Sequence, residues 1–226
     1  ASHCSRERGG GRDDTPFFQY DPTNNQYQPI GIEIWDPPYF GQSTDSRCPD
    51  GARCRYSDAT LVEYTIHPAD VAFGYLARTT SSSRLTAGST EISHTAPRFT
   101  IIGEYYYPID GEPLEKIGYA SGWTWGGVRA ANSCVNVPRR DPPDLVYICQ
   151  AVVDSFAQPG DSGAPVFSWV GGNDVNVIGT LLGQLRDDTS THYVFSPMSG
   201  IVTDLGNLYT YDQGPEPNPC APQIIC

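Results

Sequence analysis

A serine between two glycines is the feature of this sequence that most directly indicates chemistry. Ser162 lies within Gly160-Asp161-Ser162-Gly163-Ala164-Pro165-Val166. Glycine adopts backbone angles closed to other residues and lets a substrate approach the main chain, and amides around such a turn can point at one developing oxyanion. Because a serine hydroxyl is a weak nucleophile, it needs a general base, most often histidine. The stretch therefore predicts a serine nucleophile that works with a histidine.

Four histidines are candidates for that base, and His3 has the best context. It follows small residues and precedes a cysteine that could anchor the backbone, in Ala1-Ser2-His3-Cys4. His67 before a proline and His94 in a polar segment are interpreted as surface residues. His192 belongs to a strand-like run near the C-terminus and could instead line a pocket. We expect His3 to be the base, with a purely structural role as the alternative.

The third member of such a site is a buried carboxylate, which orients the histidine and stabilises the imidazolium. Asp58 precedes the small and apolar run Ala59-Thr60-Leu61-Val62, as a residue at the start of a buried strand would. A buried aspartate needs a strong partner, and a histidine N–H is one. Asp70, in Pro-Ala-Asp-Val, is the weaker candidate, and a turn cap is the alternative role for Asp58.

The composition indicates an all-β protein. Among 226 residues there are 23 Gly, 20 Pro, 14 Tyr and 8 Phe but one Met, a mixture that favours strands and turns over long helices. The net charge of −12 makes nucleic acid or an anionic membrane surface a poor partner. No apolar run reaches the roughly 18 residues of a membrane span.

Seven cysteines indicate disulfides and an oxidising, extracellular compartment. No C-x-x-C occurs and no histidine stands at ligand spacing from these cysteines, so neither a metal nor another cofactor is expected. Spacing does not establish connectivity, but it leaves Cys4 single and suggests three local pairs: Cys48 with Cys54, Cys134 with Cys149, and Cys220 with Cys226.

Short strand-like runs recur along the chain, separated by turn residues, as in a β-barrel or sandwich. A Ser/Thr-rich stretch at 78–90 is interpreted as a linker or long surface loop. One short helix is expected from Met198 to Leu205, with Ser196 as N-cap, Pro197 at the first helical position and Gly206 at its end. The expected strands are 31–35, 60–66, 98–107, 117–123, 145–153, 165–170, 175–185 and 192–196.

The order His3, Asp58, Ser162 resembles that of the chymotrypsin-like serine peptidases, particularly their bacterial, streptogrisin-like branch. The matching words are Ala-Ser-His-Cys (1–4), Tyr-Ser-Asp-Ala-Thr-Leu-Val (56–62), Lys-Ile-Gly-Tyr-Ala-Ser-Gly-Trp-Thr-Trp-Gly-Gly-Val (116–128), Gln-Pro-Gly-Asp-Ser-Gly-Ala-Pro-Val-Phe (158–167) and Phe-Ser-Pro (195–197).

The resemblance implies two six-stranded antiparallel β-barrels with the active site in the cleft between them, followed by one short C-terminal helix. The family's first strands precede the histidine motif, so this chain is expected to be N-terminally truncated and its first barrel incomplete. The expected domains are residues 1–90, residues 91–210, and a Pro-rich tail at 211–226.

The resemblance also implies a role for each site residue. Ser162 would be the nucleophile, His3 the general base and acid, and Asp58 the orienting carboxylate. The amides of Gly160 and Ser162 would form the oxyanion hole. Asp161 would point inward and pair with an internal cation, for which Lys116 lies at the matching position.

Two further expectations follow from the resemblance. Cys134–Cys149 would tie two strands of the second barrel, and Cys4 would pair with a cysteine upstream. Phe156, rather than an aspartate, occupies the sixth position before the serine, which argues against a basic P1 side chain and for an apolar or small one. Asp154, two residues earlier, leaves a basic P1 side chain as the alternative. The expected specificity residues are Phe156, Gln158, Leu182, Gln184 and His192.

The sequence therefore predicts a secreted, monomeric serine endopeptidase that cleaves protein or peptide substrates through an acyl-enzyme, without a cofactor and without nucleic acid or membrane partners. The alternative is a catalytically inactive peptidase homologue that acts as a secreted binding module. The presence of His3, Asp58 and Ser162 together argues against that alternative.

Overall fold

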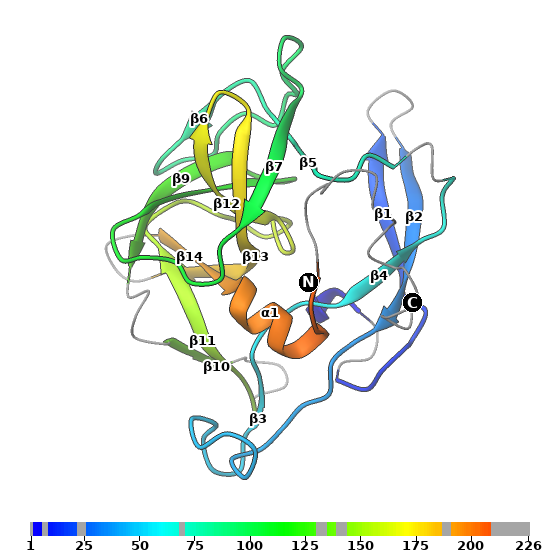
Figure 1. The fold of residues 1–226 in the computed structure, drawn as a ribbon, viewed down its shortest axis with the longest axis vertical. Coiled ribbons are helices and arrows are strands. Elements are labelled where there is room, and N and C mark those ends of the chain that lie inside the picture. Colours follow the sequence, from blue (N-terminus) through cyan, green and yellow to red (C-terminus); the bar gives the residue numbers. More distant parts are fainter. Residues whose placement is uncertain are drawn as a thin grey trace.

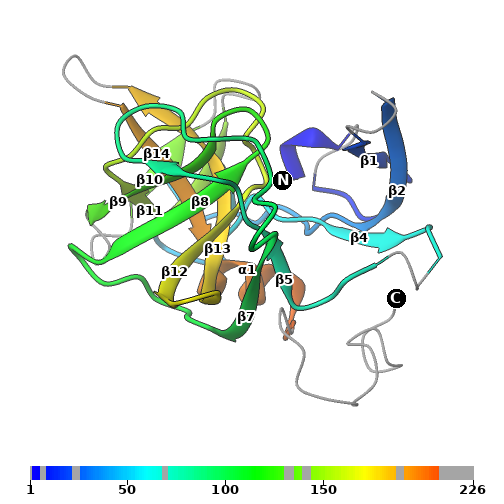
Figure 2. The same ribbon diagram turned by 90° about the horizontal axis from the view of Figure 1, so that it is seen from above.

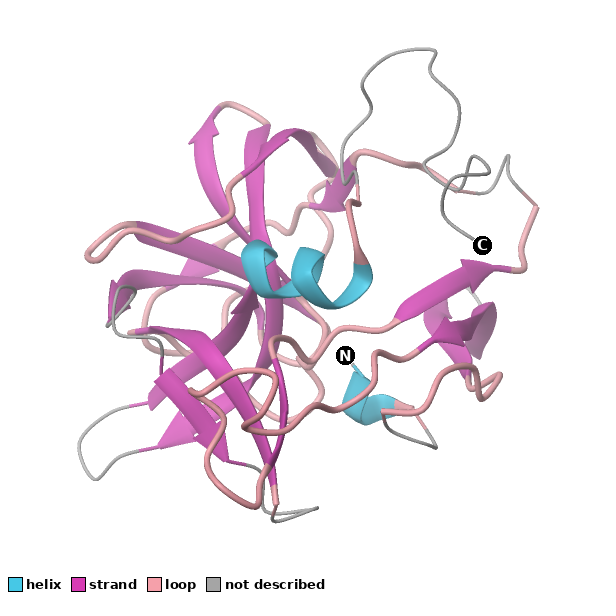
Figure 3. Cartoon of the chain, turned by 60° about the horizontal axis from the view of Figure 1, so that its bottom comes forward, coloured by secondary structure: helices cyan, strands magenta, loops and turns pink. Residues whose placement is uncertain are grey.

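The computed structural model describes residues 2–5, 9–21, 26–67, 71–129, 135–138, 144–186 and 191–208. Strands dominate these residues, and one short α-helix follows the last strand (Figure 3), so the expected all-β class is confirmed. The elements are η1 (Ser2–Cys4), β1 (Pro16–Asp21), β2 (Gln26–Trp35), β3 (Arg53–Arg55), β4 (Leu61–Tyr64), β5 (Tyr75–Ala77), β6 (Ser82–Ser83), β7 (Arg98–Glu104), β8 (Pro113–Gly118), β9 (Gly122–Arg129), β10 (Val135–Pro138), β11 (Leu145–Val153), β12 (Pro165–Gly171), β13 (Asp174–Arg186), β14 (Thr191–Pro197) and α1 (Met198–Leu205).

Six strands close into an antiparallel barrel in the C-terminal part of the chain (Figure 1). Each neighbour pairs with the next in the circuit β8–β9–β11–β14–β13–β12–β8. The pairing of β11 with β9, through Val152↔Arg129 and Val153↔Val128, completes the circuit. Closure leaves these strands without an open edge. The expected six-stranded second barrel is therefore present.

The barrel interior is filled by alternate side chains of its strands, as the pleat requires. Phe195 and Tyr193 of β14 meet edge to face with 6.4 Å between ring centroids. The helix α1 covers a second cluster, in which Met198 and Ile201 pack with Phe99 and Val175. The barrel core consists of Leu114, Val128, Ala151, Val153, Ala157, Ala164, Val166, Ile178, Leu181, Tyr193 and Phe195.

The N-terminal part forms a smaller, open sheet beside the barrel (Figure 2). Its strands pair antiparallel in the order β1–β2–β4, and no described strand closes it into a second barrel. This arrangement agrees with the expected incomplete first barrel. The strands β5 and β6 pair instead with β7 and β9 of the large sheet, and the domain boundary at residue 90 stays a prediction. No described helix has the length and apolar character to cross a bilayer.

Two local predictions need correction. A single strand over 117–123 is wrong, because residues 119–121 form the turn between β8 and β9 and Gly122 takes a φ of 62°. The helix has the predicted bounds, but Pro197 is its N-cap and makes no side-chain cap. Ser196 belongs to β14, where its hydroxyl bonds elsewhere.

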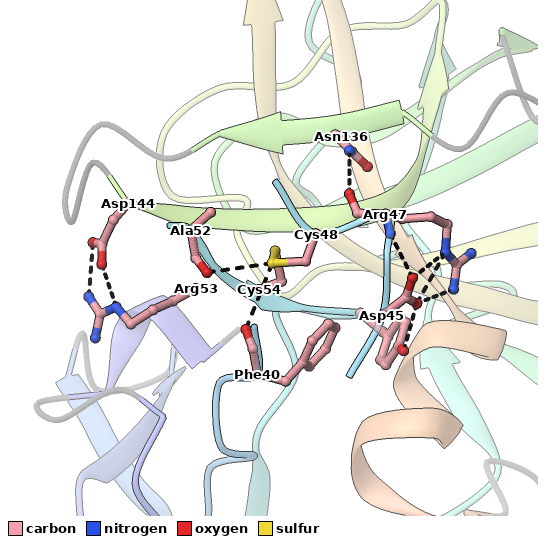
Figure 4. The surroundings of a disulfide bond; sticks show 10 residues. Phe40, Asp45, Arg47, Cys48, Ala52, Arg53, Cys54, Asn136 and Asp144 are labelled. Carbon is pink, nitrogen blue, oxygen red and sulfur yellow. Dashed lines mark hydrogen bonds and ion pairs between the residues drawn. A yellow bond between two sulfur atoms is a disulfide. The ribbon is translucent and has the colours of Figure 1, made fainter. Parts of the chain in front are cut away.

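The expected Cys48–Cys54 disulfide is present and fully buried beside β3 and β11 (Figure 4). It packs against Val146 and Ile148 of β11. Cys4 is the free cysteine among the described residues, and Cys149 is disulfide-bonded. Cys134, expected to pair with Cys149, lies outside the described residues, as do Cys220 and Cys226.

Candidate active site

The histidine and the aspartate predicted from the sequence meet, although 55 residues separate them in the chain. The short helix η1 carries His3 and lies between the small sheet and the barrel (Figure 1). The His3 ring Nδ1 hydrogen-bonds to Oδ2 of Asp58, and the His3 main-chain N–H donates to Oδ1 at 2.9 Å. Because a carboxylate only accepts, Nδ1 is the protonated ring nitrogen. Both the ring and its backbone are thus fixed by one carboxylate.

The charges of His3 and Asp58 each shift the pKa of the other residue. Asp58 is 1% exposed. Burial disfavours its ionised form, but the hydrogen bond and charge of His3, with a hydrogen bond from Tyr147, hold the pKa of Asp58 below its usual value. Burial likewise lowers the pKa of His3, while hydrogen bonds to Asp58 and Cys4 outweigh it and raise the pKa to about 9. The pair is an imidazolium–carboxylate at neutral pH.

Further hydrogen bonds hold Asp58 from the barrel side. The Tyr147 hydroxyl donates to Asp58 Oδ1 at 2.7 Å. The main-chain N–H of Asp58 donates to Ser196 Oγ at 3.0 Å, and Ser196 Oγ donates to Gln150 Oε1 at 2.7 Å. The sequence did not reveal Tyr147, because it stands in the apolar run of β11, where a tyrosine is usually a core residue.

Ser162 lies on a tight turn between the barrel strands β11 and β12. The flanking Gly160 and Gly163 have φ values of 100° and 84°, which side chains rarely permit. The turn is joined to β13 by Gly163 N–H to Leu181 O at 2.9 Å and by Leu181 N–H to Ala164 O at 2.8 Å. Ser162 is partly exposed, and within the described part of the chain its hydroxyl makes no hydrogen bond, with His3 or any other group.

Asp161 turns inward, into a fully buried ion pair. Its Oδ2 lies 3.2 Å from Lys116 Nζ, and the ammonium also donates to Ser121 Oγ at 2.7 Å. Burial opposes its ionisation, but the charge of Lys116 and the hydrogen bonds of Ser121 hold the pKa of Asp161 below its usual value. A side chain at Gly118 would place its Cβ 2.2 Å from Asp161 Oδ1, so this site requires glycine.

Main-chain amides complete the shell around Asp161. The N–H groups of Ala120 and Ser121 donate to Oδ1 at 3.0 and 2.9 Å, and the N–H of Gln158 donates to Oδ2 at 3.1 Å. The hydroxyl of Ser121 also donates to Oδ2. The carboxylate therefore ties the loop before Ser162 to the β8–β9 turn.

The expected specificity residues lie on two segments, the loop before Ser162 and the strands β13 and β14. Gln158 Nε2 donates to Ala120 O at 2.6 Å, and Leu182 is buried beside Tyr147. His192 is buried, with its Nδ1 2.8 Å from Asp154 and its Nε2 3.0 Å from Arg129.

Phe156 and Gln184 complete this set. The Phe156 carbonyl accepts a hydrogen bond from Thr124 at 2.8 Å, and Gln184 lies opposite Tyr193 of β14. A hollow of about 440 Å³ near α1 is lined by other residues, among them Tyr56, Tyr107 and Thr203. The role of the five residues in specificity stays a prediction. In the described ranges, no group of three or more His, Cys, Asp or Glu side chains could hold a metal ion.

No protein-family model and no curated protein matches the chain by sequence. Several solved structures resemble it in shape. The chymotrypsin of Cellulomonas bogoriensis is 16% identical, over 92% of this chain and 83% of that one, with a TM-score of 0.49. The Nocardiopsis protease is 15% identical, over 87% and 94%, with a TM-score of 0.49, and Thermobifida fusca protease A is 14% identical, over 84% and 92%, with a TM-score of 0.46.

All three TM-scores lie below 0.5. The solved structures that resemble the chain in shape are bacterial chymotrypsin-like serine proteases.

Proposed function

We propose that this protein is a serine endopeptidase that hydrolyses peptide bonds through an acyl-enzyme. The observation that carries the proposal is the double contact of His3 with the buried carboxylate of Asp58. A carboxylate bound to Nδ1 leaves Nε2 as the ring nitrogen that exchanges a proton with a nucleophile. The glycine-flanked turn of Ser162, anchored by Asp161, supplies the matching nucleophile.

The reaction would proceed in two halves. Ser162 Oγ attacks the substrate carbonyl while His3 Nε2 accepts its proton, and Asp58 stabilises the imidazolium. The oxyanion is bound by the main-chain N–H groups of Gly160 and Ser162. His3 then protonates the leaving amine, which breaks the C–N bond and leaves the acyl-enzyme. A water molecule, deprotonated by His3, attacks the ester, and Ser162 is released with its proton restored.

The proposed substrates are proteins or peptides with an apolar or small P1 side chain, because Phe156 rather than an acidic residue occupies the sixth position before Ser162. We also propose that the protein is secreted and monomeric and binds neither nucleic acid nor membranes. The buried Cys48–Cys54 disulfide and the net charge of −12 support these points.

Labelling with an organophosphonate tests the nucleophile directly. At a pH above the His3 pKa of about 9, the protein is expected to gain one adduct on Ser162, located by peptide mass spectrometry. Ser162→Ala should remain unlabelled. Ser168→Ala, which removes a partly exposed serine of β12, should label like the wild type. Absence of an adduct on folded wild-type protein at that pH contradicts the proposal.

An inactive homologue that serves as a binding module is the second candidate. One observation favours this candidate: the Ser162 hydroxyl makes no described hydrogen bond to His3. In an enzyme, such bonds often tighten only in a substrate complex. Asp58→Asn separates the two candidates. In an enzyme the substitution stabilises the wrong histidine tautomer and lowers the labelling rate by several orders of magnitude. In a binding module, the substitution leaves the low rate at which Ser162 reacts with the phosphonate unchanged.

A further inference from the structure

We propose that Tyr147 is a positioning residue of this site, whose hydroxyl holds the Asp58 carboxylate in the orientation that His3 requires. The inference rests on the proposed role of His3 as general base. The Tyr147 hydroxyl donates to Asp58 Oδ1 at 2.7 Å, and the same oxygen accepts the main-chain N–H of His3 at 2.9 Å. With Oδ1 held by two donors, Oδ2 faces the ring of His3.

The neighbouring hydroxyl of Ser196 does not perform this role, because its single proton is used elsewhere. The amide nitrogen of Gln150 donates to the carbonyls of Tyr56 and Ile148, at 2.8 Å each, which fixes the side-chain amide with Oε1 toward Ser196. Ser196 Oγ donates to that oxygen at 2.7 Å and accepts from Asp58 N–H at 3.0 Å. Ser196 therefore fixes the Asp58 main chain, whereas Tyr147 bonds its carboxylate.

Tyr147 is itself held rigidly. It is fully buried in β11, and its ring packs in a cluster with Leu145, Val152, Leu182 and Val194. Its backbone lies in parallel register with Arg55 of β3. Because Asp58 follows Arg55 by three residues, the β3–β11 pairing that places the phenol also places the carboxylate. A hydroxyl supported in this way keeps its acceptor in place with little loss of side-chain entropy.

The phenol also moderates the basicity of Asp58. A hydrogen bond to a carboxylate stabilises its charge and lowers its affinity for a shared proton. Without that bond, Asp58 would attract the Nδ1 proton of His3 more strongly, and the imidazolium would persist to higher pH. Charged or titratable groups that a substitution at Tyr147 leaves unchanged include Cys4 beside His3, and Arg55 near Tyr147 with its neighbours Asp36 and Asp204.

Tyr147→Phe, compared with Tyr193→Phe, tests the inference. Both tyrosines are fully buried, but the Tyr193 hydroxyl has no hydrogen-bond partner among the described residues. The pKa of His3, measured by NMR titration of its ring proton, is expected to rise by about 0.5–1 unit in Tyr147→Phe and to stay unchanged in Tyr193→Phe. In an active enzyme, kcat should fall about tenfold with KM nearly constant, and the pH–rate profile should move with the His3 pKa.

An unchanged His3 pKa in folded Tyr147→Phe, or an equal shift in both variants, overturns the inference. If Tyr147→Phe does not fold, wild-type protein labelled with ¹³C at the tyrosine Cζ provides the test. The Tyr147 signal should titrate with the His3 ring, and the Tyr193 signal should not; a silent Tyr147 signal overturns the inference. These titrations require no catalysis, so a failure of Ser162 to react would refute the peptidase proposal while leaving the Tyr147 result readable.

Discussion

Loss of the buried Lys116 ammonium should destabilise the protein severely, because it leaves Asp161 without its cation. Both side chains are fully buried, with 3.2 Å between Nζ and Oδ2. Removing one partner of a buried pair costs about 3–5 kcal/mol. Asp161 retains hydrogen bonds from the N–H groups of Ala120, Ser121 and Gln158. The loss of unfolding free energy in Lys116→Met is therefore expected at the lower end of that range, about 3 kcal/mol.

The assay is guanidinium unfolding followed by circular dichroism, with an exposed ion pair as the control. Arg53 bonds Asp144 at 2.6 Å, but both side chains are more than 40% exposed, so Arg53→Met should cost less than about 1 kcal/mol. Adding Asp161→Asn to Lys116→Met should restore part of the loss, since the uncompensated charge is gone.

The labelling rate of Ser162 tests whether the Lys116–Asp161 pair supports the site as well as the fold. Because Asp161 ties the loop before Ser162 to the β8–β9 turn, Lys116→Met should slow phosphonate labelling of Ser162 under conditions where the variant is still folded. A Lys116→Met protein that unfolds at the same denaturant concentration as Arg53→Met, and labels at the wild-type rate, would refute this reasoning.

Four further predictions concern protonation and the disulfide. Glu33 is fully buried in β2, and burial is the main cause that raises its pKa from 4.5 to about 7. Between those pH values the folded state binds a proton that the unfolded state releases, so the free energy of unfolding falls as pH rises. In urea unfolding, Glu33→Gln should therefore be more stable than the wild type by about 2 kcal/mol at pH 8 and by almost nothing at pH 4, and equal effects at both pH values would be the contrary result. The kcat/KM of the wild type should rise with pH to a midpoint near 9, the pKa of His3, and a midpoint at or below 6.5 would contradict the electrostatics of the His3–Asp58 pair. The same raised pKa means that the stability contributed by charged His3 is complete below 6.5 and is lost as pH rises through about 9, so melting curves of His3→Ala and wild type should converge above that pH. Replacing both Cys48 and Cys54 by alanine should cost about 2 kcal/mol in chemical unfolding, as expected for a short disulfide loop, and a loss near zero would show that packing alone holds this segment.

Elements with a clear local pattern could be predicted from the sequence, and contacts that depend on strand pairing could not. The apolar run of β11 and the segment of α1 between Pro197 and Gly206 are predicted at their observed bounds. The β8–β9 hairpin was missed because apolar residues flank its turn closely on both sides. Buried Glu33 was missed because it is a single charged residue between Ile32 and Ile34 on β2, and a charged residue between apolar ones is typical of a strand with one solvated face.

The same limit applies at the site. Residue chemistry alone suggested that His3 and Asp58 belong together, and they meet. The tyrosine that bonds Asp58 has no signature in the sequence, since the contact exists only once β3 has paired with β11. Polar side chains in apolar runs acquire their partners from tertiary structure, and pattern analysis assigns them to the core.

The closed circuit of the barrel has a consequence for the order in which parts of the molecule unfold on heating. The turn that carries Ser162 and the side chain of Asp58 are both bonded to barrel strands. Gly163 N–H donates to Leu181 O of β13, and the Tyr147 hydroxyl of β11 donates to Asp58. His3 lies outside that circuit, on a three-residue helix next to an open three-stranded sheet. Regions with fewer cooperative contacts open at lower free energy than the core. On heating, His3 would therefore separate from Asp58 before the barrel melts, and the proposed peptidase activity would be lost while most of the β-structure is intact.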